Sequence, residues 1–195
     1  MRRIAPTLTL LLAMAGGAAA RDAPIVDTAK APAVTKLEAE VLEQINGART
    51  NPAAFARLLP STPGAATEAA NELQNRRPAP PLTLDERLAA AARKHAAEQG
   101  ALGGHSHLGS DGSRPMERMR REGVWSMLTA EEMSLGQATA KGVVIQLIID
   151  EGSRMRAHRS DLMNPLFTLG GVGCAPHTTY RVVCVIDLSG APMER

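Results

Sequence analysis

The sequence has 195 residues, of which 44% are hydrophobic and only 2% aromatic, and its formal net charge is +2. This length accommodates one domain of ordinary size, whose core must be built mainly from aliphatic side chains and methionine. The composition argues against a disordered chain, a collagen-like chain and a strongly acidic or basic tail.

The first twenty residues have the pattern of a secretory signal peptide. Arg2 and Arg3 precede an uncharged stretch, 8–15, and small residues follow it. The apolar run is too short to span a bilayer as a helix, so we expect residues 1–20 to be removed before Arg21. The alternative is a buried N-terminal helix. Cleavage predicts a secreted or periplasmic protein with no transmembrane segment.

Cleavage would also change the charge of the protein. The removed segment holds two arginines and no acidic residue, so the formal net charge of the remaining chain falls from +2 to zero. A neutral protein lacks the basic excess that favours binding to phosphate backbones. Nucleic acid is therefore not an expected partner.

Two cysteines, Cys174 and Cys184, remain in a chain bound for an oxidising compartment. Both lie in runs of residues with high β-propensity, and the segment 176–179 between them has the composition of a turn. A hairpin centred near Thr179 would place the two sulfurs opposite each other at bonding distance. We therefore predict a cross-strand disulfide, which would leave neither cysteine free to act as a nucleophile.

The N-terminal part of the mature chain is predicted to be helical after an Ala/Pro-rich, flexible lead-in, 21–36. Apolar residues recur every three or four positions over 37–48, which predicts a first helix. A second short helix is predicted over 53–59. The segment 60–82 has no clear period and is interpreted as a Pro/Ala-rich connector on the surface.

A longer helix is predicted to follow the connector. Thr83 and Glu86 have the spacing of a capping box, and the helical pattern continues to Gln99, before Gly100. His95 lies on the apolar face of this helix. We interpret it as a hydrogen-bonded histidine at the edge of the core rather than as a metal ligand.

The C-terminal half is predicted to contain two more helices, over 114–121 and 138–151, with a polar segment, 152–165, after them. The disulfide-pinned hairpin then closes the domain. Helices followed by a terminal hairpin indicate the α+β class.

Few side chains could serve as acids, bases or metal ligands. The candidates are His105, His107, His158, His177, Glu131, Glu132, Asp150 and Glu151. His105 and His107 are alternate residues, so in an extended segment both imidazoles would point to one side. No serine-nucleophile, zinc-protease or phosphate-binding motif is present. The residues alone indicate a secreted α+β domain with a candidate His/Glu site.

Several segments, in this order, resemble the bacterial branch of the CAP superfamily, which comprises cysteine-rich secretory, antigen 5 and pathogenesis-related 1 proteins and is also called SCP-like. The similar segments in the first half are the N-x-x-R helix ending at Arg49, residues 82–100, which resemble the P-L-x-x-D-x-x-L-x-x-A-A-x-x-H-A helix, and the S-H-x-x-x-D-G stretch from Ser106. Those in the second half are Arg118, Gly123, the G-E-N glutamate at Glu131, the G-H-R motif at His158 and the V-G-x-G motif at Gly171-Val172-Gly173.

The resemblance implies an α-β-α sandwich with a central antiparallel sheet between layers of helices, in a domain that spans 37–190. It also implies a cleft lined by two histidines and one or two acids, which correspond here to His107, Glu131 and His158. Such a set would suit zinc or another divalent cation. The alternative is that the three groups hydrogen-bond one another and hold the loops.

Two departures from the family pattern leave the composition of this cleft open. Where many members have Gly-Glu-Asn, this chain has Ala130-Glu131-Glu132, so either acid could turn inward. The second glutamate of the family could be replaced by Asp150, by Glu151 or by neither.

The resemblance favours a non-enzymatic, secreted binding module for a lipid or sterol, a glycan or an envelope protein. The alternative is a metal-assisted hydrolase acting on peptides, in which Glu131 is the general base and His107 and His158 hold the metal. A third interpretation is an envelope protein with a structural role that acts through its surface.

Overall fold

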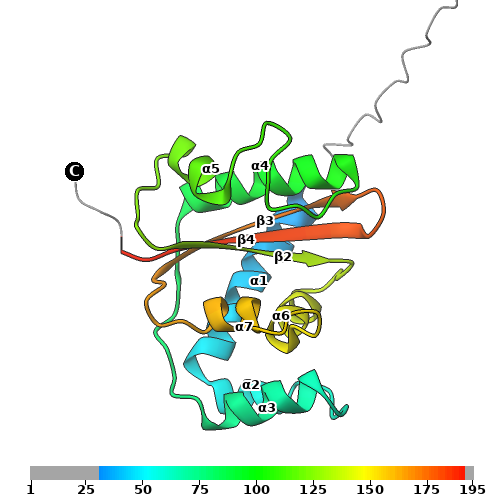
Figure 1. Ribbon diagram of the computed structural model, residues 1–195, viewed down its shortest axis with the longest axis vertical. Coiled ribbons are helices and arrows are strands. Elements are labelled where there is room, and N and C mark those ends of the chain that lie inside the picture. The colour runs from blue at the N-terminus through cyan, green and yellow to red at the C-terminus, as the bar shows by residue number, and fades with distance from the viewer. Residues whose placement is uncertain (1–30, 192–195) are drawn as a thin grey trace, which may run out of the picture.

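The computed structural model describes residues 31–191, with side chains from Lys36 onward (Figure 1). The predicted signal peptide and residues 21–30 lie outside this part of the chain. The first helix begins at Ala31, so the end of the predicted flexible lead-in is helical. No helix within the described part is long and apolar enough to cross a membrane.

The described part contains helices and strands in mixed order. They are α1 (Ala31–Thr50), α2 (Pro52–Ala56), α3 (Ala65–Asn75), β1 (Thr83–Leu84), α4 (Glu86–Leu102), α5 (Pro115–Arg121), β2 (Thr129–Leu135), α6 (Ala140–Ile149), α7 (Ala157–Leu162), β3 (Leu169–His177) and β4 (Arg181–Ser189). The strands form one sheet in the order β1-β3-β4-β2. The pairs β3–β4 and β4–β2 are antiparallel, and the two-residue β1 adds a short parallel edge.

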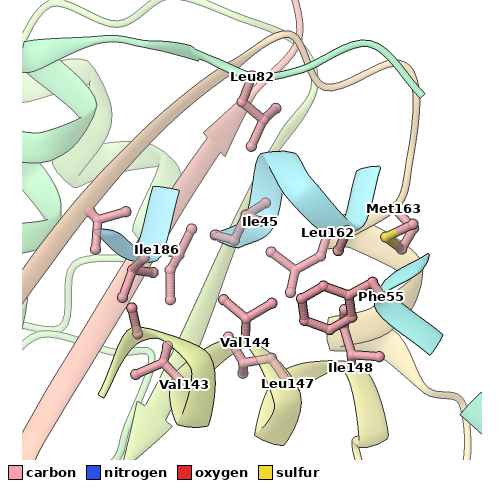
Figure 2. Packing of buried hydrophobic residues seen from close by; sticks show 14 of the residues in the cluster. Ile45, Phe55, Leu82, Val143, Val144, Leu147, Ile148, Leu162, Met163 and Ile186 are labelled. Atoms are coloured by element: carbon pink, nitrogen blue, oxygen red, sulfur yellow. The ribbon is translucent and has the colours of Figure 1, made fainter. Parts of the chain in front are cut away.

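Helices cover both faces of this sheet, which confirms the predicted α-β-α sandwich. Figure 1 shows α4 and α5 on one side of the sheet and α6 and α7 on the other, with α1 crossing behind and α2 and α3 farther out. The larger core cluster lies between the sheet and α1, α2 and α6. In Figure 2 the side chains of Ile45, Phe55, Val144 and Ile148 point toward one another in this core.

The other face of the sheet packs against α4 at unusually short range. Its core uses small residues, including Ala92 and Ala96, against Val183 and Val185. A Cβ atom added at Gly173 would lie 2.1 Å from the backbone nitrogen of Arg93. Glycine on β3 therefore allows the helix to approach the strand backbone.

The predicted disulfide is confirmed. Cys174 and Cys184 are directly opposite each other on β3 and β4 and are covalently bonded. The turn of this hairpin is capped by His177, whose Nδ1 accepts hydrogen bonds from the backbone N–H groups of Thr179 and Tyr180 at 3.1 and 3.0 Å.

The ends of α4 differ from the prediction. Its N-cap is Asp85, whose carboxylate accepts hydrogen bonds from the backbone N–H groups at the start of the helix, whereas Thr83 belongs to β1. The helix continues through Gly100 to Leu102 and ends at Gly103, which adopts a left-handed conformation with φ 67°. Gly100 is needed for packing, since a Cβ there would lie 2.2 Å from the carbonyl oxygen of Pro176.

Besides the two-residue β1, three elements were not apparent from the residue pattern. The predicted connector 60–82 contains α3, which buries Ala66, Ala69 and Leu73 at helical spacing. Strand β2 is buried through most of its length and lacks an alternating pattern. The third element, α7, is only six residues long and lies in the predicted polar segment.

Candidate functional site

Two of the candidate acids, Glu131 and Glu132, lie on β2, at one edge of the sheet. Adjacent residues of a strand point to opposite faces, so Glu131 and Glu132 lie on different sides of the sheet although both are buried. Glu131 meets side chains of α4, α5 and the loop between them, whereas Glu132 meets α7 and the end of α6. The sheet therefore separates two acid–histidine clusters.

The first cluster surrounds the carboxylate of Glu131. His107 Nδ1 lies 2.9 Å from Glu131 Oε1, and Arg118 Nη2 donates to Oε2 at 2.5 Å. His95 Nε2 lies 3.7 Å from Oε1. Burial disfavours the charge of Glu131, but the hydrogen bonds from His107 and Arg118 outweigh it and lower its pKa. Glu131 is thus an ionised carboxylate with both oxygens bonded.

A second acid, Asp187, lies directly opposite Glu131 on β4 and is 1% exposed. Burial and the neighbouring charge of Glu131 raise the pKa of Asp187 well above its usual value. Two adjacent buried carboxyl groups cannot both be charged at low cost, and Arg118 pairs with Glu131. The pair therefore carries one negative charge, which resides on Glu131.

The same residues hold the loop 103–114, which connects α4 to α5. Arg118 Nη1 donates to the carbonyl oxygens of His107 and Ser113, at 3.0 and 2.8 Å. His95 Nε2 lies 2.9 Å from the carbonyl oxygen of Ser106. We refer to Glu131, His95, His107, Arg118 and Asp187 as the Glu131 cluster.

The second cluster lies on the opposite face of the sheet and comprises Glu132, Asp150, His158 and Asp161; we refer to it as the Glu132 cluster. His158 Nδ1 is 2.7 Å from Asp150 Oδ1, and its Nε2 is 3.5 Å from Glu132 Oε2. Burial, the charge of Asp161 and a hydrogen bond to it raise the pKa of Glu132 to about 9. Glu132 is therefore protonated near neutral pH.

The structure brings together two of the three predicted cleft residues. His107 and Glu131 are in contact, but His158 is bonded to Asp150 and lies near Glu132 instead. His105 and Glu151 are exposed.

Sequence reasoning missed two members of the Glu131 cluster as site residues, Arg118 and Asp187. An acid within the apolar run of β4 was the available signal for Asp187. The interpretation of His95 as a hydrogen-bonded histidine at the edge of the core is confirmed, because it is buried and contacts Ser106.

The Glu131 cluster does not fit a metal ion. Within residues 31–191, no group of three or more His, Cys, Asp or Glu side chains is arranged to hold one. Both oxygens of Glu131 are bonded to N–H groups, and one of them belongs to the cationic guanidinium of Arg118. A divalent cation at Glu131 would have to displace the guanidinium of Arg118, whose only ion pair among the described residues is with Glu131.

Open pockets lie beside both clusters. One of about 490 Å³ lies against the Glu131 cluster, lined by His95 and Arg118 among other charged residues. Another of about 600 Å³ lies between β2 and α6 and reaches Asp150 and His158 of the Glu132 cluster. A third, of about 400 Å³ and mostly apolar, lies between α1 and α4. The domain thus offers surfaces for ligands outside the buried clusters.

Comparisons with known proteins identify the family of this fold. The sequence profile of the CAP, or cysteine-rich secretory protein, family matches residues 42–187. None of the curated proteins compared with the chain matches it. An extracellular protein with an SCP domain from Bacillus anthracis is similar in structure, with TM-score 0.55 and 19% identity over 86% of this chain; the chain spans 45% of that protein.

A second similar structure is an outer surface protein of Borrelia burgdorferi, with TM-score 0.53 and 18% identity. The match covers 78% of this chain and 90% of that protein. At these identities, the similarity to the two bacterial structures supports the assignment of the fold alone. The profile match covers most of the chain and agrees with the sandwich and its helical layers, so this protein belongs to the cysteine-rich secretory protein (CAP) family.

Proposed function

We propose that this protein is a secreted, non-enzymatic binding module in which the Glu131 cluster holds the loop 103–114 in place. One observation carries the proposal: both oxygens of the Glu131 carboxylate already accept hydrogen bonds from buried or adjacent N–H groups. A general base needs an oxygen that can accept a proton from a bound water or substrate. The Glu131 side chain is only 1% exposed and each of its oxygens is already engaged, so both oxygens are shielded from water and substrate while Arg118 and His107 are in place.

The alternative of a metal-assisted hydrolase has less support. It requires His107 and His158 to share one metal, with Glu131 as the base. The Nδ1 atom of each histidine instead contacts a different carboxylate, and the two carboxylates belong to different clusters. A structural role, in which Glu131, His107 and Arg118 hydrogen-bond one another and hold the loop, explains these residues without any catalysed reaction.

The partner is proposed to be a component of the cell envelope or its surroundings: a lipid or sterol, a glycan or a protein. Secretion is supported by the predicted signal peptide. It is also supported by the descriptions of the two similar structures as an extracellular and an outer surface protein.

Zinc titration calorimetry on the mature, metal-stripped protein tests this proposal. We expect the same small heats from the wild type, from the double variant His107→Ala/His158→Ala and from the control His105→Ala, which alters an exposed histidine of the same loop. Stoichiometric binding with a Kd of about 1 µM or tighter that only the double variant loses would contradict the proposal. The hydrolase hypothesis would then become the better account.

A further inference from the structure

We propose that the free edge of β2 binds an extended polypeptide segment as an added strand, with a lysine or arginine of that segment at the acidic end of the adjoining groove. This inference rests on the proposed binding role and names the class of partner. It is drawn from the hydrogen-bond pattern of β2, the groove beside it and the charges that line this groove.

The pattern of hydrogen bonds shows which backbone groups of β2 face outward. Gly136 N–H donates to the carbonyl oxygen of Val182 at 2.9 Å, in the register that pairs β2 with β4. Hydrogen-bonded positions alternate in an antiparallel pair, so the even-numbered residues of β2 bond to β4. Glu131, Met133 and Leu135 therefore direct their backbone N–H and C=O groups away from the sheet.

Part of this outer edge is already occupied, and part is open. Gln146 Nε2 donates to the carbonyl oxygen of Leu135 at 3.2 Å, which closes one end. Among the described residues, no backbone hydrogen bond is made by the outward groups of Glu131 and Met133. Unpaired N–H and C=O groups on an edge strand are a template for another strand.

A groove of about 600 Å³ runs beside this edge, between β2 and α6. Met133 and Leu135 at the edge of β2 line the groove on one side, and Ile145 and Ile149 on α6 line it on the other. Side chains of an added strand would alternate between the two faces of the sheet, so every second side chain would face α6. An extended main chain supplies both N–H and C=O groups at the spacing of the open edge, and neither a lipid nor a glycan does so.

The charges of the groove favour a cationic segment. Asp150 and Glu151 line one end, beside His158, and the described residues that line the groove include no lysine or arginine. The Asp150 carboxylate is held by His158 through both its side chain and its backbone N–H, so its position is fixed. A lysine or arginine at this end of the bound segment would meet complementary charge.

A labelled peptide, acetyl-Lys-Val-Thr-Ile-Thr-Val-amide, serves as the probe, and its affinity is measured by fluorescence anisotropy. Two versions carry N-methyl groups on alternate residues, in opposite parity, so that only one version loses the N–H groups that face β2. We expect one parity to weaken binding at least about tenfold and the other to have little effect. Because this comparison uses the wild-type protein, it does not depend on the folding of a variant.

Protein variants then locate the edge. Met133→Pro removes the outward N–H and leaves the bonds to β4 intact, and Met133→Ala truncates the same side chain but keeps that N–H. We expect Met133→Pro to bind the probe at least about tenfold more weakly than Met133→Ala. Glu151→Gln should weaken binding of the lysine peptide but not of its norleucine analogue.

Absence of binding by the wild type at millimolar peptide would overturn the inference. Equal effects of the two N-methyl parities, or equal affinities of the two Met133 variants, would do so as well. Mass spectrometry shows whether the recovered peptide has been cleaved, and this distinguishes failure of the edge site from failure of the proposed non-enzymatic function. A peptide that binds at the edge but is cleaved would contradict the non-enzymatic role, and an intact peptide that does not bind would contradict only the edge site.

Discussion

Glu131 and Glu132 are neighbours in sequence with opposite ionisation. Glu131 faces Arg118 and His107, and these donors lower its pKa despite burial. Glu132 faces Asp161 and Asp150, and burial together with these acids raises its pKa to about 9. The difference arises because successive side chains of a strand enter different surroundings.

The pH dependence of stability should reveal the proton on Glu132. Its pKa is 4.5 in the unfolded chain and about 9 when folded. The stability that this proton confers is complete below the unfolded pKa and is lost as pH rises toward 9, by up to about 1.4 kcal/mol per pH unit. Glu132→Gln keeps a neutral amide in place, so we expect the unfolding free energy of the variant to rise relative to that of the wild type as pH rises.

Urea denaturation at about pH 5, 7 and 9 checks this prediction. Asp187 has a shift in the same direction and remains in the variant, so the quantity of interest is the difference between variant and wild type at each pH. Glu43→Gln, on the exposed face of α1, is the control and should show a constant difference. A constant difference for Glu132→Gln too would show that this proton is absent.

The residues of the candidate site could be predicted only in part. A histidine and an acid at His107 and Glu131 were found from the resemblance, and they are in contact. The partners that decide their role, Arg118 and Asp187, lie on other elements, and no local pattern links them to β2. Whether Glu131 is free or bonded depends on these long-range contacts, which the spacing of residues along the chain does not encode.

Among the elements, α1 is joined to distant segments by a single buried arginine. Arg49 is 0% exposed, and burial lowers its pKa. Its guanidinium donates to the carbonyl oxygens of Pro80, Leu162, Asn164 and Phe167. This explains the arginine of the N-x-x-R pattern, since no other side chain offers a planar fork of five donors.

Arg49→Lys should therefore destabilise the protein by about 3 kcal/mol, because a lysine ammonium cannot reach four carbonyl groups at once. The free energy of unfolding in urea is the measurement, and the exposed Arg57→Lys is the matched control. A loss no greater than that of the control would mean that the four hydrogen bonds contribute little.

The packing of α4 on β3 depends on glycine at two positions. Cβ atoms at Gly171 and Gly173 would each lie 2.1 Å from a backbone nitrogen of α4. Gly173→Ala should cost more than about 4 kcal/mol or prevent folding, because backbone atoms cannot yield as a flexible side chain can. Circular dichroism and thermal unfolding measure this loss. Gly152→Ala, with no atom within 4 Å of the added Cβ, should leave stability nearly unchanged.

Elements with a run of large apolar residues at a clear period could be predicted from the sequence, whereas α3 was missed because its buried positions are mostly alanine. The helices near 37–48, 114–121 and 138–151 and the terminal hairpin correspond to α1, α5, α6 and β3–β4. The ends of α4 were misplaced because Asp85 competes with Thr83 as the cap. Strand β2 was missed because its buried glutamates have the composition of a surface segment, although both of its faces are covered.

At the scale of the whole molecule, the sheet divides the charged groups between its two faces. The Glu131 cluster lies under α4 and α5, and the Glu132 cluster lies beside α6 and α7. In the first cluster Arg118 pairs with the charge of Glu131, and in the second His158 pairs with Asp150. The open edge of β2 lies between the two clusters, and this edge is the binding site that we propose.

The measurement that tests the central claim most directly is the stability and loop protection of Glu131→Gln. The claim is that ionised Glu131 holds the loop 103–114 through His107 and Arg118. The neutral amide of this variant would leave the buried Arg118 without its carboxylate partner, so we predict a loss of about 3 kcal/mol in unfolding free energy at neutral pH.

Hydrogen exchange measured alongside should show faster exchange across the loop 103–114 in Glu131→Gln, with α6 and the β3–β4 hairpin unchanged. Glu43→Gln is the control for both measurements. Wild-type stability and loop protection in Glu131→Gln would contradict the account, because Glu131 would then be free for another role.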